Sequence, residues 1–137
     1  MNWLAYALAT VVLWTAWSFL GVIALKEVSA AHATLVFGVA VVVVGVASLA
    51  LGNRGGPWSP SGLGVAAISG GCGALGMATF YLALSHGKAS SVVPVIGVYP
   101  AFVALLAVAL LSESLSAAQT VGVFLAVIGV VLVGTGG

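Results

Sequence analysis

Charged side chains are almost absent from this sequence. Of its 137 residues, only three are Lys or Arg and two are Asp or Glu, whereas roughly a quarter of the residues in an ordinary soluble domain are charged. Hydrophobic residues make up 63% of the chain, so it lacks the polar surface that keeps a folded domain in water. The composition predicts a membrane protein that is embedded in the lipid bilayer.

The few charges form no cluster. The net charge is +1, and Lys26, Arg54 and Lys88 are widely separated, so no basic patch exists that would attract nucleic acid or anionic lipid. We therefore expect no nucleic-acid partner. No charge falls at the centre of an apolar run, so the chain also lacks the intramembrane carboxylate that proton and cation exchangers usually need.

Cysteine and catalytic motifs are equally scarce. Cys72 is the only cysteine, which excludes an intrachain disulfide, and its apolar surroundings predict a buried, inert thiol. His32 and His86 are too far apart in sequence to form a helical metal pair. No Cys/His cluster, serine elbow, phosphate loop or dinucleotide fingerprint occurs. We expect neither an enzyme nor a bound metal or cofactor.

What the chain has instead is five long apolar runs. A helix crossing a hydrocarbon core of about 30 Å needs about 20 residues, with charges and turn formers at its ends. The first run is too long for a signal peptide and has no basic flank, so we expect it to be retained. Valine-rich stretches also favour strands, but a sheet in lipid must close into a barrel with alternating polar positions, which these runs lack.

The sequence therefore predicts an all-α membrane protein. We expect one domain over residues 1–137, a bundle of five transmembrane helices at about residues 3–25, 33–51, 63–85, 89–111 and 117–133.

Five spans place the two ends of the chain on opposite sides of the membrane. Lys26 and Lys88 then share one face and Arg54 lies on the other, a weak bias under the rule that Lys and Arg favour the cytoplasmic side. One fixed orientation and insertion in both orientations, giving an antiparallel pair, both remain open. We interpret Lys26, Lys88 and Glu113 as interfacial charges, with a gating or packing role still open for Glu113.

Small residues recur at helical spacing in two of the runs. The stretch SGGCGALGMA, residues 69–78, contains several pairs four apart, and Gly122 and Gly129 are seven apart. Such residues let helix backbones approach closely in lipid. Tight packing inside the bundle and a sliding or dimer face are both consistent with this spacing.

Uncharged polar and aromatic side chains lie at membrane depth. Trp14, Trp17 and Ser18 fall at positions i, i+3 and i+4 and so share one helical face. Both tryptophans are about midway along their run, where anchoring at the interface explains them poorly. Together with Tyr81 and Tyr99 they are candidates for lining a polar path, and plain core packing is the alternative.

The fourth run contains the stretch PVIGVYP. Proline donates no backbone hydrogen bond, so Pro94 and Pro100 weaken the helix at the carbonyls of Ser90 and Ile96. We expect a kink there, with Pro94, Gly97 and Pro100 as a flexible element. Freed carbonyls are costly in lipid, and carriers build sites and hinges from broken helices. A kink that only improves packing is the alternative.

Two stretches resemble the EamA domain of the drug/metabolite transporter superfamily. Residues 13–26, LWTAWSFLGVIALK, are similar to its first helix, with a tryptophan and a terminal lysine. Residues 80–116 resemble its tyrosine-alanine-leucine segment, the serine-to-proline start of the fourth helix and the closing glutamate, here Glu113. The resemblance covers essentially the whole chain. Thr15 and Ser112 depart from it, because relatives often have glycine at those positions.

The resemblance implies a permease or exporter for metabolites in the cell (plasma or inner) membrane. Relatives work by alternating access, with two inverted five-helix repeats around a central path. This sequence contains one repeat, so we expect it to pair with an inverted copy of itself or with a similar subunit. Small neutral or zwitterionic solutes are the expected cargo. A structural or regulatory membrane subunit that transports nothing is the alternative.

Overall fold

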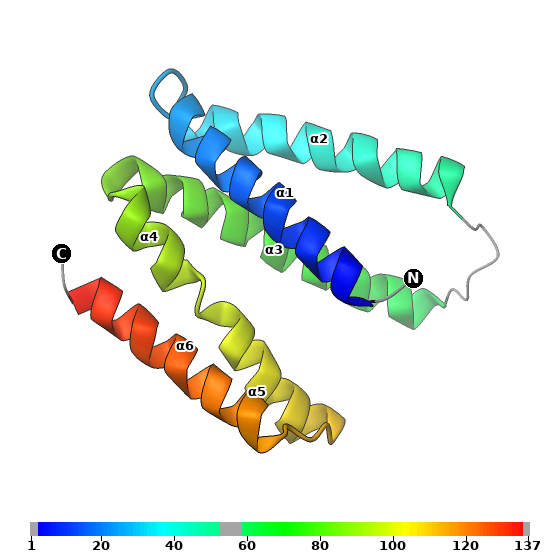
Figure 1. The fold of residues 1–137 in the computed structure, drawn as a ribbon. Coiled ribbons are helices and arrows are strands. Elements are labelled where there is room, and N and C mark those ends of the chain that lie inside the picture. The colour runs from blue at the N-terminus through cyan, green and yellow to red at the C-terminus, as the bar shows by residue number, and fades with distance from the viewer. Residues whose placement is uncertain (1–2, 53–58, 136–137) are drawn as a thin grey trace. The chain divides into compact units, whose positions relative to one another are not determined.

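The structure, a computed structural model, describes residues 3–52 and 59–135. All secondary structure in these residues is helical (Figure 1). The helices are α1 (Trp3–Ala24), α2 (Ala30–Leu51), α3 (Pro60–His86), α4 (Ala89–Ile96), α5 (Tyr99–Leu111) and α6 (Ala117–Thr135). Because α4 and α5 belong to one apolar segment, the described residues contain five segments able to cross a membrane. The predicted fold class is confirmed.

The lengths and surfaces of these segments suit a bilayer. They contain 19 to 27 residues, which at the rise of an α-helix corresponds to lengths of about 28 to 40 Å. Among the described hydrophobic residues only Phe80, Tyr81 and Ala101 are buried, and most large apolar side chains are exposed. Such a surface is unsuited to water and suits lipid tails, which are as apolar as the side chains themselves.

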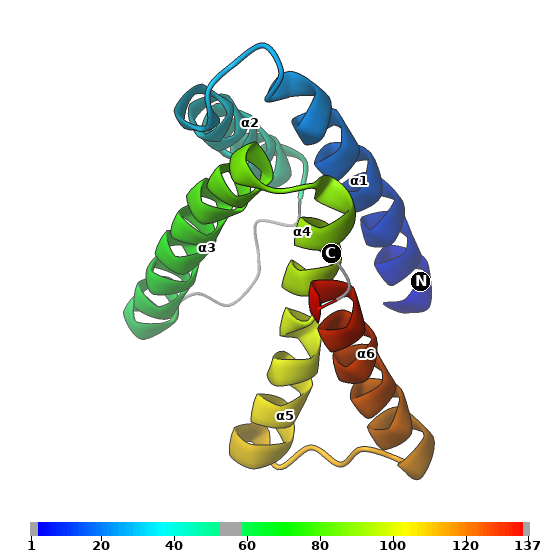
Figure 2. The ribbon, with the colours of Figure 1, turned by 90° about the vertical axis from the view of Figure 1, so that its left-hand side faces the viewer.

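The chain divides into two compact units, Met1–His86 and Gly87–Gly137. Unit 1 contains α1 to α3, with α2 packed along α3. Unit 2 contains α4 to α6, with α6 packed against both α4 and α5 (Figure 2). Each unit contains one candidate functional feature of its own.

Capping serines set the first residues of α2 and α3. The Ser29 hydroxyl accepts from the His32 backbone N–H at 3.4 Å and lies 2.7 Å from His32 Nδ1. The Ser59 hydroxyl accepts from Gly62 N–H at 3.0 Å, and Pro60 stands at the first helical position, where a missing N–H does no harm. Both helices therefore begin three residues before the apolar edges read from the sequence.

Local hydrogen bonds also fix the turn between α5 and α6. Ser116 Oγ accepts from Gln119 N–H at 3.3 Å, and Gln119 Oε1 accepts from Ser116 N–H at 2.8 Å, which forms a reciprocal capping box. At the end of α5, Ser112 has a left-handed backbone with φ 57°. Glu113 N–H then donates to the Ala107 carbonyl at 3.3 Å, as in a common helix C-cap.

The expectation that Cys72 is buried is wrong, because its thiol is exposed on α3. Around it, Gly70, Gly71 and Gly73 have nothing within 4 Å of the position a Cβ would take. The same is true of Gly122 and Gly129 on α6. An apolar run in a membrane protein needs no protein cover, and these small residues make no close helix contact within the described chain.

Candidate functional site

The fourth apolar segment is interrupted in its middle. Gly97 and Val98 separate α4 from α5, and Val98 N–H donates to the Val95 carbonyl at 3.4 Å, one residue closer than in an α-helix. Pro100 then occupies the second position of α5 and offers no N–H to the Ile96 carbonyl. The predicted loosening of this helix is confirmed, whereas its movement as a hinge stays a prediction.

A glycine at position 97 avoids a close contact with the backbone of the preceding turn. Its φ of −59° and ψ of −3° are open to any residue, but a Cβ would stand 3.1 Å from the Pro94 carbonyl oxygen. Pro94 itself lies inside α4. The interruption thus results from a proline on each side and a residue without a side chain between them.

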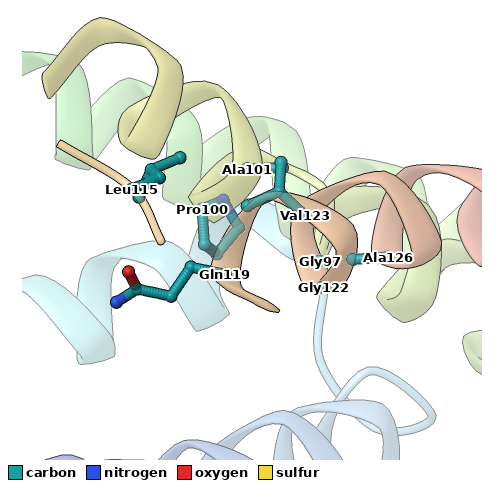
Figure 3. A pocket seen from close by; sticks show the side chains of 8 residues that line it. All are labelled: Gly97, Pro100, Ala101, Leu115, Gln119, Gly122, Val123 and Ala126. Atoms are coloured by element: carbon teal, nitrogen blue, oxygen red, sulfur yellow. The ribbon is translucent and has the colours of Figure 1, made fainter. Parts of the chain in front are cut away.

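A hollow of about 360 Å³ lies beside the interruption. Its lining comes from the interruption, from α5, from the loop that follows α5 and from α6; α5 and α6 diverge toward that loop (Figure 2). Gln119 is the one polar side chain of the lining, and such a mostly apolar wall is usual for small-molecule sites. Figure 3 shows the lining residues, which are Gly97, Pro100, Ala101, Leu115, Gln119, Gly122, Val123 and Ala126.

Unit 1 supplies an aromatic cluster centred on Trp17. The indole stacks on Phe80 with ring centroids 5.0 Å apart and lies 5.7 Å from the ring of Phe37. Its Nε1–H donates a hydrogen bond to the Tyr81 hydroxyl at 3.1 Å. The cluster therefore joins α1, α2 and α3. It includes the two buried residues of α3, Phe80 and Tyr81, which are 7% and 5% exposed.

Gly21 allows the close contact between α1 and α3. It is the one buried residue of α1, and a Cβ there would stand 3.1 Å from Cε1 of Tyr81. Any larger residue at this position would push against the ring that accepts the Trp17 hydrogen bond. Close approach over a small residue is how helices associate in lipid.

Ser18 is the neighbour of Trp17 and is half-buried. The other hydroxyls of α1 bond to their own helix: Thr10 Oγ1 donates to the Tyr6 carbonyl at 2.9 Å and Thr15 Oγ1 to the Val11 carbonyl at 2.7 Å. The Ser18 side chain makes no such bond within the described part of the chain. Its hydroxyl is available to form a hydrogen bond with another group.

The structure brings together some of the predicted path residues and not others. Trp17 and Tyr81 are in direct contact, with Ser18 adjacent to Trp17. Trp14 is 54% exposed and outside these ring contacts, and Tyr99, the first residue of α5, is 46% exposed in the other unit. Trp14 makes no ring contact with the cluster and Tyr99 belongs to unit 2, so their part in a path stays a prediction.

The predicted interfacial charges lie at helix ends and are exposed. Lys26 follows α1, Lys88 is the N-cap of α4, and Glu113 follows the C-cap of α5. Arg54 lies outside the described residues.

Sequence reasoning missed several residues of both features. Phe37 and Phe80 complete the aromatic cluster, but an apolar run gives no signal that separates a phenylalanine in a cluster from one facing lipid. Gln119 lines the hollow, and its spacing from Ser116 is the capping-box pattern, a signal that could have placed it at the start of α6. Leu115 and Ala126 carry no comparable signal.

Comparison with known protein families identifies the family of the chain. No curated protein and no solved structure matches the chain. The model of the EamA-like transporter family matches residues 1–135 and so includes both the aromatic cluster and the interrupted helix. Members of this family are transporters rather than enzymes. The chain belongs to the EamA-like transporter family of the drug/metabolite transporter superfamily and is a multi-pass membrane protein.

Proposed function

We propose that this protein carries small neutral or zwitterionic solutes across the cell membrane by alternating access. The observation that carries this proposal is the interruption at Gly97–Val98 inside a 23-residue apolar segment. Interrupting a helix in lipid leaves backbone groups to be satisfied elsewhere. Carriers accept this cost because broken helices provide binding groups and hinges, and a hollow adjoins the break here.

The solute path is proposed to follow the candidate residues Trp14, Trp17, Ser18, Tyr81 and Tyr99. The contact between Trp17 and Tyr81 supports the part of this path that lies in unit 1. Within the described residues, Glu27 and Glu113 lie outside the helices, so no carboxylate stands at membrane depth to neutralise a cation. Uncharged hydrogen-bonding groups suit a neutral or zwitterionic solute better.

We propose that residues 1–137 act as one EamA-like domain, because the family model runs across both units. A second repeat in the opposite orientation, from another copy or a similar subunit, would complete the path. The exposed small residues of α3, including Gly70 and Gly73, support this pairing because they offer a surface on which helices approach closely.

The test is solute counterflow in vesicles that contain the purified protein alone. The proposal predicts saturable exchange of at least one neutral or zwitterionic metabolite above the rate in protein-free vesicles. Before reconstitution, cooperative unfolding in detergent verifies that the purified protein is correctly folded. If correctly folded protein exchanges none of the neutral or zwitterionic metabolites tested, the result would favour a structural or regulatory subunit of a larger complex.

A further inference from the structure

The hydrogen bond between Trp17 and Tyr81 has a fixed direction. The indole Nε1–H can only donate, whereas a tyrosine hydroxyl both donates and accepts. Because the two atoms are 3.1 Å apart, the Tyr81 oxygen is the acceptor of this bond. The hydroxyl therefore retains its own hydrogen, and within the described residues Trp17 is its one hydrogen-bond partner.

The position of this hydrogen makes an acceptor necessary. Tyr81 is 5% exposed, and a buried hydroxyl without an acceptor is unfavourable. The hydroxyl oxygen lies 3.9 Å from the position that a Cβ of Gly21 would take, and the Gly21 carbonyl accepts from Leu25 N–H at 3.0 Å. This buried donor has no acceptor among the described residues of unit 1, so an acceptor oxygen from a bound molecule would be favourable there.

The surroundings of Tyr81 hold this donor in place. Its ring rests on the Gly21 backbone, meets the edge of Trp17 with ring centroids 6.3 Å apart, and lies 5.8 Å from the ring of Phe80. The indole occupies one acceptor direction of the oxygen. The hydroxyl hydrogen must therefore point in one of the other directions around the oxygen. The packed ring holds this donor in position, as a binding site requires.

We infer that Tyr81 recognises an acceptor oxygen of the transported solute, either a carboxylate or a carbonyl oxygen. Trp17 is the positioning residue, because its N–H holds the tyrosine oxygen. When the tyrosine donates to the solute, its oxygen becomes a better acceptor for the indole, so the two bonds strengthen each other. The free hydroxyl of Ser18 offers a second polar group beside them. This inference rests on the proposed function and specifies the chemistry of its solute.

The test compares zwitterionic solutes that carry a carboxylate with cationic solutes that lack it. L-leucine and L-phenylalanine carry a carboxylate, and isopentylamine and phenethylamine have the same side chains and amino group without it. Tyr81→Phe removes only the donor hydroxyl, so we expect the Kd of both amino acids to rise about tenfold, as for the loss of one hydrogen bond. Any binding of the amines should be equally strong in the variant and the parent. Tyr6→Phe, which removes a hydroxyl from α1 outside the cluster, is the matched control.

The indole N–H resonance of Trp17 reports on the same bonds directly. In protein labelled at tryptophan, Trp17→Phe assigns this resonance and Trp3→Phe, at an exposed position, is the control. Tyr81→Phe should move it upfield without any solute. Adding either amino acid to the parent should move it downfield in a saturable way, and adding either amine should not.

The outcomes separate this inference from transport itself. An amino-acid-dependent shift that Tyr81→Phe abolishes supports the inference even if vesicles show no flux, in which case only the transport proposal fails. Saturable flux of an amino acid with the same affinity in Tyr81→Phe as in the parent overturns the inference and leaves the transport proposal standing. Absence of any shift with both amino acids also overturns it.

Discussion

The ring of Tyr81 on α3 rests on the backbone of Gly21 on α1, so closely that a Cβ at position 21 would stand 3.1 Å from Cε1. At the hydroxyl of the same ring, Trp17 donates its indole hydrogen to the tyrosine oxygen at 3.1 Å. Trp17 and Gly21 are four residues apart and therefore occupy one face of α1. One turn of α1 thus fixes Tyr81 in two ways: Trp17 binds its hydroxyl, and Gly21 leaves room for its ring.

Substituting Gly21→Ala should destabilise the protein. The new methyl group overpacks a buried ring, which typically costs about 1–3 kcal/mol, while the better helix propensity of alanine returns about 1 kcal/mol. We expect a net loss of about 1 kcal/mol in the free energy of unfolding in mild detergent. Gly38→Ala on α2 is the control, since nothing lies within 4 Å of its Cβ position, and it should gain up to about 1 kcal/mol. Equal effects of the two substitutions would contradict the contact.

Pro100→Ala should join α4 and α5 into a straighter helix. The substitution restores an N–H four residues after Ile96, so the carbonyl freed by the proline regains its usual donor. If movement at the interruption limits turnover, counterflow should slow about tenfold or more while solute affinity changes little. Pro60→Ala is the matched control, because that proline stands at the first position of α3. Unchanged exchange in Pro100→Ala would remove the hinge assignment.

Ser112→Gly should stabilise the protein. Ser112 has φ 57°, a left-handed conformation that disfavours residues with a side chain and suits glycine at the end of a helix. We expect the free energy of unfolding to rise by about 0.5–1 kcal/mol. Ser112→Ala keeps the Cβ and should bring no gain, so a rise of the same size in both variants would contradict the backbone explanation.

The capping box at the start of α6 should be measurable by the same unfolding assay. Ser116→Ala removes the acceptor of Gln119 N–H, and loss of such a cap typically costs about 1 kcal/mol. Ser116→Asp supplies another good capping oxygen and should retain most of the stability. If alanine and aspartate at this position behave alike, the hydrogen bond at 3.3 Å does not support α6.

Hydropathy was sufficient to place the five spans, because lipid requires long apolar helices whatever their neighbours are. Their first residues were less predictable where a capping serine precedes the apolar edge, as Ser29 and Ser59 do. The interruption near Gly97 followed from proline chemistry alone, which acts within one turn. The left-handed backbone of Ser112, with φ 57°, could not be predicted from the sequence, because serine does not specify this conformation.

The candidate site depended on contacts that sequence spacing does not contain. Trp14 and Trp17 have the same residue type and share one face of α1, yet Trp17 meets Phe37, Phe80 and Tyr81 while Trp14 is exposed. Which of two tryptophans contacts α3 depends on how the helices pack in three dimensions. The burial expected of Cys72 failed for a related reason, because an apolar stretch in lipid can face outward.

We propose that two oppositely oriented copies of this chain enclose the solute path. The most direct measurement fuses reporters after Gly137, one active only in the cytoplasm and one active only outside it. Insertion in both orientations predicts comparable signals from the two fusions, which would make an antiparallel homodimer the carrier. A signal from one fusion alone would contradict pairing between inverted copies of this chain.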